Sequence, residues 1–408
     1  MTDQETWLVS RPHYLAALNR WRDSSGLVKV ITGVRRCGKS ALLEIFRQQL
    51  LADGVSEASI VSLNFESLDL SDIDSYQALN DFVTARSYPE GRRYILLDEV
   101  QLVPQWERAV NSLRLDPRND IYLTGSNARL LTSQLASLLS GRYVQIEVFP
   151  LSFAEIWSAH QPAPGVSAAG VFNEYLRAGG LPGQFILPDV AGTRVQYIDG
   201  VLNTIIAKDI ILNRQVRDVD ALQKILRYLS ANIGNLISVK GIADYMTSTG
   251  RRVAADTVDN YLTLLEEAYL FYRARREDIK GKTVMKTNDK FYLVDLGFRQ
   301  VTAGPRASDV GRSLENVVYF ELRRRYSQVS VGKLGATEVD FVALDPSTGP
   351  AYFQVTQTMA DDATRQRELR PLQALRDSYP KTVLSLDEVR TPDYGGIRHE
   401  NLLEWFIR

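Results

Sequence analysis

The sequence contains one cysteine, Cys37, and three histidines, His13, His160 and His399, spread over 408 residues. One cysteine cannot form an intramolecular disulfide, and these side chains are too scattered to predict a zinc site. No apolar run approaches the roughly 20 residues that a membrane-spanning helix needs. The N-terminal segment MTDQETWLVSRPHYL lacks the basic and then apolar pattern of a signal peptide. These absences predict a cytoplasmic protein without a membrane partner.

Net charge is also nearly absent, because 48 lysines and arginines stand against 49 aspartates and glutamates. The overall charge therefore favours no class of partner, and a preference for nucleic acid would have to come from local clusters. A hydrophobic content of 45% is enough for the cores of two to four compact units in a chain of this length.

Short apolar runs alternate with helical segments between residues 27 and 152. The runs are LVKVIT, SIVSLNF, RYILLDEV, DIYLTGSN and YVQIEVFPLS. Apolar strands that are separated by helices are typical of a parallel sheet buried on both faces. The sequence therefore predicts an α/β fold whose first part, residues 1–158, is a parallel-sheet core.

The rest of the chain predicts three further regions. A helical lid or linker is expected over 159–217. Residues 218–284 have the order helix, short strand, helix, turn, longer helix and extended segment, which is the order of a winged helix-turn-helix. Strands and helices mix again over 285–408, which predicts another α/β unit.

The segment VITGVRRCGKSALLEI has the spacing of a phosphate-binding loop, between an expected strand and an expected helix. The first amides of that helix would point at phosphates, and the two glycines would let the backbone curl around them. Lys39 would neutralise charge on the β- and γ-phosphates, and the Ser40 hydroxyl would bind Mg²⁺. The predicted nucleotide-binding residues are Gly33, Val34, Arg35, Arg36, Cys37, Gly38, Lys39, Ser40 and Ala41.

A second motif, YILLDEVQ, ends an apolar strand with two acidic residues. Asp98 would hold the water shell of Mg²⁺, and Glu99 would polarise the attacking water. Ser126 and Asn127 end another expected strand, where they could sense the γ-phosphate. Together with Lys39, these residues predict an ATP hydrolase that uses ATP and Mg²⁺.

Motifs along nearly the whole chain resemble those of bacterial and archaeal AAA-type ATPases that join a P-loop ATPase core and a winged helix to a restriction-endonuclease-like domain. The motifs include GVRRCGKS, LLDEVQ, LTGSNARLL, YLRAGGLPG, LVDLGFR, LENVVYFEL and EVDFVA. The resemblance implies a ring-like or spiral oligomer, of which a hexamer is one form, in which a neighbouring subunit's arginine completes each site. Arg142 is our first choice for this arginine, ahead of Arg129, and a surface ion pair is the alternative role of either.

The resemblance also implies a nuclease-like site in the last region. Glu315, Asp340 and Gln354 match the positions around its Mg²⁺, but Thr356 stands where the family pattern has a lysine. Because threonine cannot stabilise the developing charge on a phosphate, we expect the site to be inactive. A buried pair kept for folding is the alternative role of Glu315 and Asp340, and an active nuclease would need another lysine, such as Lys333.

The stretch from Arg273 to Lys290 has seven lysines and arginines against three acidic residues, a surplus of four positive charges. Such a surplus at a winged helix predicts DNA contact, and a solvated surface is the alternative. The predicted DNA-binding residues are Arg251, Arg252, Arg273, Arg275, Arg276, Lys280 and Lys282. The leading hypothesis is an oligomeric ATPase that acts on branched or single-stranded DNA, and the alternative is a nucleotide-dependent switch that binds a protein partner.

Overall fold

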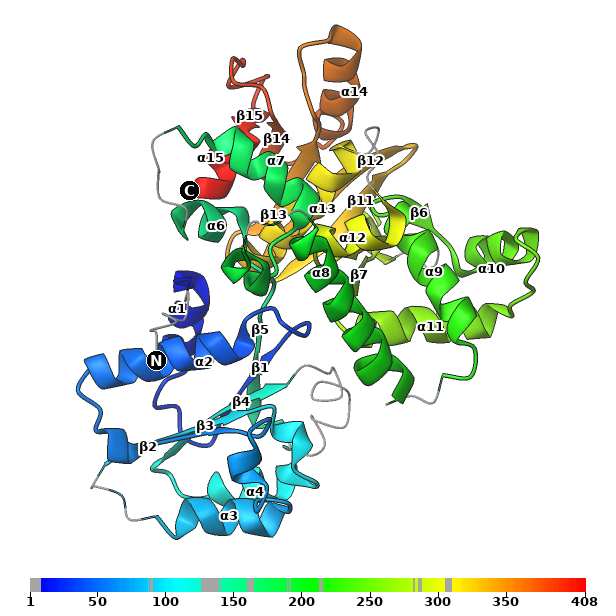
Figure 1. The fold of residues 1–408 in the computed structure, drawn as a ribbon. Coiled ribbons are helices and arrows are strands. Elements are labelled where there is room, and N and C mark those ends of the chain that lie inside the picture. The colour runs from blue at the N-terminus through cyan, green and yellow to red at the C-terminus, as the bar shows by residue number, and fades with distance from the viewer. Residues whose placement is uncertain are drawn as a thin grey trace. The chain divides into compact units, whose positions relative to one another are not determined.

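The structure is a computed structural model, shown as a ribbon in Figure 1. It describes residues 9–86, 88, 91–125, 139, 141–159, 165–188, 190, 192–212, 216–281, 283–284, 288–304 and 310–408. The chain divides into two compact units. The first contains Met1–Pro150, Leu181–Ile186 and Glu267–Tyr269, and the second contains Leu151–Gly180, Leu187–Glu266 and Leu270–Arg408.

The first unit is built on a five-stranded parallel sheet with the order β2-β3-β4-β1-β5. Its strands are β1 (Val28–Thr32), β2 (Ile60–Asn64), β3 (Arg93–Asp98), β4 (Asn119–Gly125) and β5 (Tyr143–Glu147). Every residue of β1, β3 and β4 is buried. Each of the five apolar runs supplies one strand, so the predicted parallel sheet is confirmed.

Helices cover both faces of this sheet. They are α1 (Pro12–Arg20), α2 (Lys39–Ala52), α3 (Tyr76–Thr84) and α4 (Trp106–Leu113), with short 3₁₀ helices at Glu57–Ser59, Leu68–Leu70 and Val100–Leu102. Successive residues of a strand point to opposite faces. Ile121 and Leu123 of β4 therefore join the core that α3 and α4 close, whereas Tyr122 packs on Phe46 of α2, with 4.8 Å between ring centroids.

Helices begin the second unit, and a small antiparallel sheet follows. The helices are α6 (Phe153–Ala159), α7 (Ala168–Ala178), α8 (Thr193–Thr204), a π-helix (Ile205–Leu212), α9 (Val219–Ala231), α10 (Val239–Ser248) and α11 (Ala255–Glu267). Asp218 and Ser238 cap α9 and α10, because their side chains accept hydrogen bonds from the amides of Ala221 and Gly241. The sheet has the order β6-β10-β7 and consists of β6 (Leu236–Ile237), β10 (Asp289–Leu293) and β7 (Phe271–Ala274).

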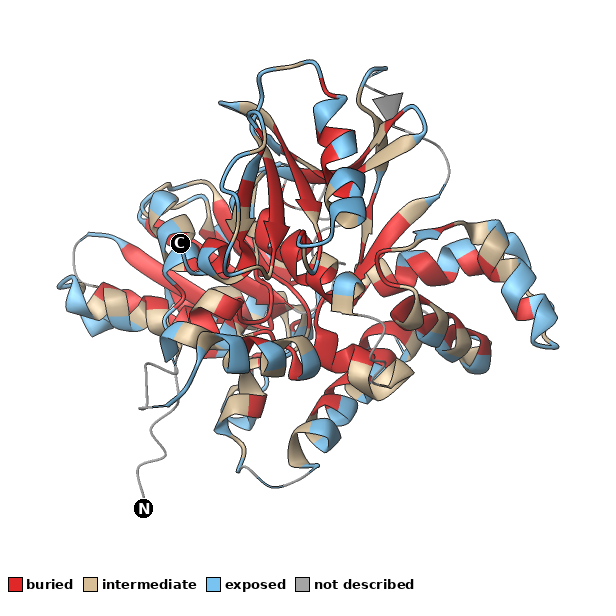
Figure 2. Ribbon diagram, turned by 90° about the horizontal axis from the view of Figure 1, so that it is seen from above, coloured by how far each residue is buried: buried red, intermediate tan, exposed pale blue. Residues whose placement is uncertain are grey.

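A seven-stranded sheet forms the rest of the second unit. In spatial order its strands are β15 (Arg398–Asn401), β14 (Lys381–Ser385), β13 (Gly349–Val355), β12 (Thr337–Asp345), β11 (Gln328–Leu334), β8 (Arg276–Asp278) and β9 (Thr283–Val284). The helices α13 (Val310–Arg325), α14 (Asp362–Gln373) and α15 (Leu402–Ile407) pack on this sheet, whereas α12 (Leu296–Ala303) packs on α7, α8 and α9. Figure 2 shows that buried residues follow the central strands.

Strand pairing crosses the predicted boundary after residue 284. β8, from the expected winged-helix region, pairs with β11 of the larger sheet, whereas β10, from the expected last region, pairs with β7 and β6. The boundaries of the four predicted regions stay predictions. Within the described ranges, no helix is both long and apolar enough to span a membrane.

Candidate functional site

The phosphate-binding loop joins the carboxyl end of β1 to the start of α2. Gly33 has a φ of +144°, and a β-carbon there would collide with the carbonyl oxygen of Val148. Gly38, with a φ of +102°, precedes the first residue of α2. Both conformations suit glycine, and a loop that curls in this way before a helix is typical of phosphate-binding sites.

Lys39 is almost fully buried, with 4% of its surface exposed. Its ammonium group donates hydrogen bonds to the carbonyl oxygens of Gly33 at 3.1 Å and Val34 at 3.2 Å. The ammonium group of Lys39 is therefore enclosed by the phosphate-binding loop. Phosphate oxygens are stronger acceptors than these carbonyls, so the arrangement fits a bound nucleotide.

Asp98, the last residue of β3, lies beside Ser40 and Thr124. The Thr124 hydroxyl donates a hydrogen bond to Asp98, and Ser40 is hydrogen-bonded to the same carboxylate. Burial raises the pKa of Asp98 above its ordinary value, although the hydrogen bonds from Thr124 and Ser40 oppose the shift. A hydroxyl and a carboxylate are oxygen ligands that Mg²⁺ prefers, so Ser40 and Asp98 fit the predicted metal, with phosphates and water as further ligands.

Glu99 follows with a φ of +52°, in the left-handed region that few residues other than glycine adopt. Its amide donates to the Thr124 hydroxyl at 2.9 Å, and its carboxylate accepts a hydrogen bond from Gln101. Thr124 thus holds both predicted acidic residues. Sequence reasoning missed it, although its place in YLTGSN, near the end of a strand beside β3, was a usable signal.

A second residue that sequence reasoning missed is Arg11, which is 2% exposed. Its guanidinium donates to the carbonyl oxygens of Cys37 at 3.0 Å and Phe149 at 2.8 Å. It therefore ties the phosphate-binding loop to the chain that follows β5. No motif marks this arginine, because its partners lie 26 and 138 residues away.

The other predicted loop residues have different environments. Val34 and Cys37 are buried, and burial raises the pKa of the Cys37 thiol. Arg35 lies 3.8 Å from Glu66, and Arg36 is exposed with a φ of +66°. Ala41 lies in the first turn of α2. The predicted residues Ser126, Asn127 and Arg129 fall outside the described residues.

Arg142 lies at the amino ends of the parallel strands, whereas the phosphate-binding loop lies at their carboxyl ends. It is exposed and directly precedes β5, whose first residue, Tyr143, pairs with Val28 at the start of β1. The loop follows the other end of β1, after Thr32. Burial and the positive charge of Arg142 lower the pKa of Arg114, so two cations lie near each other at this end of the strands.

In the second unit, Glu315 from α13, Asp340 from β12 and Gln354 from β13 come together. The Asp340 amide donates to the Gln354 side-chain oxygen at 3.0 Å, and the Gln354 side-chain nitrogen donates to Glu368 at 3.1 Å. The Thr356 hydroxyl instead donates to the carbonyl oxygen of Thr358 at 3.3 Å. The three residues that the nuclease pattern predicts therefore share one site.

A lysine does reach this site, but it is neither residue 356 nor Lys333. Lys290, in β10, lies 2.8 Å from a carboxylate oxygen of Glu315 and 3.9 Å from one of Asp340. Lys290 is only 5% exposed. Counting it among the basic charges of a surface was therefore wrong. Burial among distant acidic residues cannot be recognised from a run of charges.

The predicted DNA-binding residues fall into two groups. Acidic partners hold three of them: Arg251 with Asp218 and Asp220, Arg273 with Glu266 at 2.9 Å, and Arg276 with Glu338 at 3.5 Å. Three others are exposed and form no ion pair with a described acidic residue, namely Arg252, Arg275 and Lys280. Lys282 lies outside the described residues. Contact with DNA stays a prediction for all seven.

Two of the quoted motifs, YLRAGGLPG and LVDLGFR, meet inside the second unit. The Asp295 carboxylate accepts hydrogen bonds from the amides of Gly180 at 2.7 Å and Gly297 at 2.8 Å. A β-carbon on Gly179 would collide with the same carboxylate. These motifs therefore make a close packing contact between the end of α7 and the start of α12.

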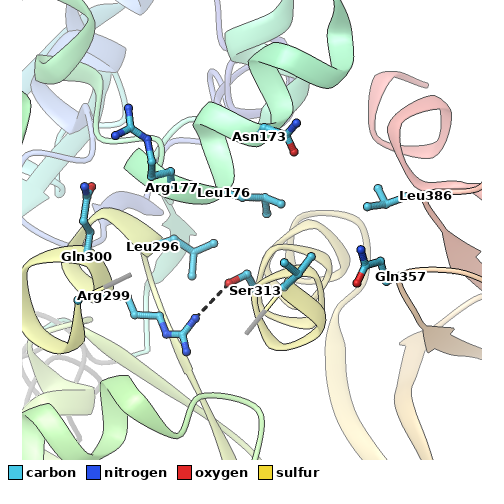
Figure 3. Close-up of a pocket in the computed structure, with 11 residues that line it drawn as sticks. Asn173, Leu176, Arg177, Leu296, Arg299, Gln300, Ser313, Gln357 and Leu386 are labelled. Carbon is cyan, nitrogen blue, oxygen red and sulfur yellow. Dashed lines mark hydrogen bonds between the residues drawn. The ribbon is translucent and has the colours of Figure 1, made fainter. Parts of the chain in front are cut away.

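A pocket of about 330 Å³ lies beside this contact, between α7, α12 and α13 (Figure 3). Arg299 from α12 points toward Ser313 from α13 and donates a hydrogen bond to its hydroxyl at 3.1 Å. It also donates to the carbonyl oxygen of Ser230 at 3.0 Å. Hydrogen bonds within the chain therefore hold Arg299 in place.

Comparisons with known proteins agree with the geometry of the first unit. The model of an AAA domain matches residues 25–157, and a domain of unknown function matches 170–309. An uncharacterised protein of Haemophilus influenzae is 34% identical over 403 residues, which are 98% of this chain and 99% of the relative. An uncharacterised protein of Methanocaldococcus jannaschii is 28% identical over 314 residues, 73% of this chain and 67% of the relative.

A solved structure shares the fold. The Walker-type ATPase of Pyrococcus abyssi has a TM-score of 0.50 at 14% identity, over 72% of this chain and 95% of that chain. At this identity the likeness concerns the fold alone. It is the fold of a P-loop ATPase, as the phosphate-binding loop and the parallel sheet indicated.

Proposed function

The chain belongs to a family of AAA-domain proteins that includes the Haemophilus influenzae relative, and on this premise we propose that it is a Mg²⁺-dependent ATP hydrolase that acts as an oligomer on DNA. The observation that carries the proposal is the hydrogen bond between Ser40 and Asp98, close to the positive charge of Lys39. A hydroxyl, a carboxylate and an ammonium group beside a glycine loop are the groups with which P-loop ATPases bind Mg²⁺ and phosphates.

Each residue of the site has a separate task in this proposal. Lys39 would exchange its two carbonyl acceptors for β- and γ-phosphate oxygens, and the bound Mg²⁺ would neutralise further phosphate charge. Glu99 would accept the proton of the attacking water as a general base. Thr124 would keep Asp98 and Glu99 in a fixed relation, because it donates to one and accepts from the other.

Substitution of Glu99 tests the hydrolase. Glu99→Gln keeps the shape of the side chain but removes the base, so we expect turnover to fall by about 10²–10⁴-fold while ATP still binds. Lys39→Ala should instead lose nucleotide binding. ATP turnover and calorimetric nucleotide binding measure the two effects, and Glu66→Gln, an exposed glutamate near the loop, is the matched control.

If purified Glu99→Gln hydrolysed ATP at the wild-type rate, Glu99 would not be the general base. Loss of nucleotide binding in Glu66→Gln would show that any charge change near the loop disturbs it.

The exposed cations Arg252, Arg275 and Lys280 support the proposal that the partner is DNA. We further propose that residues 218–284 form a winged helix, and that the nuclease-like region does not cut DNA. Stimulation of ATP hydrolysis by branched or single-stranded DNA is the expected consequence. If DNA neither bound nor altered turnover, a nucleotide-dependent switch for a protein partner would be the better proposal.

A further inference from the structure

A lysine ammonium group lies among three carboxylates in the second unit. Lys290 Nζ is 2.8 Å from an oxygen of Glu315, 3.0 Å from one of Glu338 and 3.9 Å from one of Asp340. A charge that is buried to this extent is strongly unfavourable unless opposite charges surround it. The three carboxylates meet that need together, in the way that ligands surround a metal cation.

The carboxylates reach Lys290 from two elements. Glu338 and Asp340 are two residues apart in β12, so their side chains point to the same face of the sheet. Glu315 comes from α13. All three line one pocket, which also opens to Thr337 and Gln354. An ion from solvent could therefore reach the carboxylates if Lys290 were absent.

The remaining acceptor positions of the cluster are largely occupied. The Tyr292 hydroxyl donates to Glu315, Arg276 lies 3.5 Å from the second oxygen of Glu338, and the Val355 amide donates to Asp340 at 2.9 Å. Burial and the nearby charge of Glu315 raise the pKa of Asp340, while Lys290 opposes the shift. Two cations and the protein's own donors thus satisfy the cluster.

We propose that Lys290 is an internal counter-ion that replaces the divalent cation expected at this nuclease-like site. The residues present do not fit Mg²⁺ while Lys290 is there, because its ammonium group already takes the position that three carboxylates face. Lys290 thus does not serve as the catalytic lysine that the nuclease pattern lacks at position 356. Lys290 instead occupies the place of the metal ion.

The position of Lys290 in the fold adds a second consequence. β10 pairs with β6 and β7 of the small sheet, where Lys290 stands opposite Leu236 and Ala274. Glu338 and Asp340 belong to the seven-stranded sheet. The ion pairs of Lys290 therefore join the small sheet to the larger one. A metal ion held only by Glu315, Glu338 and Asp340 would not, because none of these residues belongs to the small sheet.

Mn²⁺ binding to the full-length chain without nucleotide tests the proposal. Lys290→Met keeps the length of the side chain but removes its charge, so we expect Mn²⁺ to bind at least about tenfold more tightly than to wild type. The gain should disappear in the double variant Lys290→Met, Asp340→Asn. Lys333→Met, from the neighbouring strand β11, is the matched control and should behave as wild type. Electron paramagnetic resonance of free Mn²⁺ measures the affinity.

Two results would overturn the proposal. One is wild-type protein that binds Mn²⁺ at a site lost in Asp340→Asn, a measurement that stays decisive even if Lys290→Met does not fold. The other is a folded Lys290→Met protein without tighter Mn²⁺ binding. The experiment contains no ATP, so its failure is separate from a failure of the ATPase proposal.

Discussion

One threonine hydroxyl connects the two acidic residues of the nucleotide site. Thr124 is fully buried, donates to the Asp98 carboxylate and accepts from the Glu99 amide. The Glu99 backbone is in the left-handed region, which costs free energy for a residue with a side chain. A hydrogen bond that holds such a backbone in place also determines where the carboxylate of Glu99 points.

Replacement of this hydroxyl should weaken both the metal site and the fold. Thr124→Val keeps the volume of the side chain but removes both hydrogen bonds. We expect Mg²⁺-dependent turnover to require about 10–100-fold more Mg²⁺, because partners behind a ligand tune its affinity to this degree. The free energy of unfolding should fall by about 1–3 kcal/mol, since the partners of the lost hydroxyl stay buried.

Thr124→Ser is the control, because serine retains the hydroxyl. Turnover at several Mg²⁺ concentrations and urea unfolding measure the two effects. An unchanged Mg²⁺ requirement in Thr124→Val would show that Thr124 does not position Asp98.

At the scale of elements, the basic stretch of the sequence is divided between two roles. Arg273 and Arg276 are bound to acidic residues of neighbouring elements, Glu266 in α11 and Glu338 in β12. Arg275, between them, is exposed. Alternation along a single strand does not explain this division, because Arg273 belongs to β7, Arg276 begins β8 and Arg275 lies between the two strands.

This division makes the prediction of DNA contact sharper. The triple variant Arg252→Ala, Arg275→Ala, Lys280→Ala should weaken DNA binding and reduce the salt dependence, by about 0.9 in the logarithmic slope for each lost phosphate contact. Fluorescence anisotropy at several salt concentrations measures both quantities.

The matched control for the triple variant is Arg251→Ala, because Asp218 and Asp220 hold this arginine. Because these two carboxylates already neutralise Arg251, its loss should reduce the slope less than the loss of one exposed cation does. If the triple variant had wild-type affinity and slope, DNA would not contact these three residues.

At the scale of the whole molecule, Arg142 cannot reach the nucleotide of its own chain. It precedes Tyr143, whereas the phosphate-binding loop begins after Thr32, which pairs with Glu147 at the other end of β5. At about 3.3 Å per residue, the five steps from Arg142 to Glu147 span roughly 16 Å. Arg142 therefore acts on a nucleotide only if a neighbouring subunit brings that nucleotide to it.

Mixing two inactive variants tests this arrangement. Arg142→Ala and Glu99→Gln should each have low turnover alone, because one lacks the shared arginine and the other the base. In mixed oligomers, Arg142 of a Glu99→Gln subunit can complete the intact site of an Arg142→Ala subunit. We therefore expect the mixture to recover activity that neither variant has.

Arg118→Ala is the control for this experiment. Arg118 is an exposed arginine at the same end of the strands, directly before β4. This variant should keep its turnover. Low activity in Arg142→Ala without any recovery on mixing, or a monomer by light scattering with ATP and DNA, would contradict the shared site.

The sequence by itself determined the nucleotide site and the sheet that carries it. The loop from Gly33 to Ser40 and the pair Asp98–Glu99 are recognisable because each motif is continuous and its chemistry requires those residue types. The five apolar runs became the five strands, because burial on both faces leaves a local pattern in the chain.

The tertiary structure alone decided which charges are free and which are bound. Lys290 was one cation in a basic run until the fold placed it beside Glu315 and Glu338, which are 25 and 48 positions further along the chain. Thr124 and Arg11 likewise became parts of the nucleotide site through contacts with distant segments. The physical reason is that an ion pair or hydrogen bond depends on distance in space and on burial, neither of which a run of residue types contains.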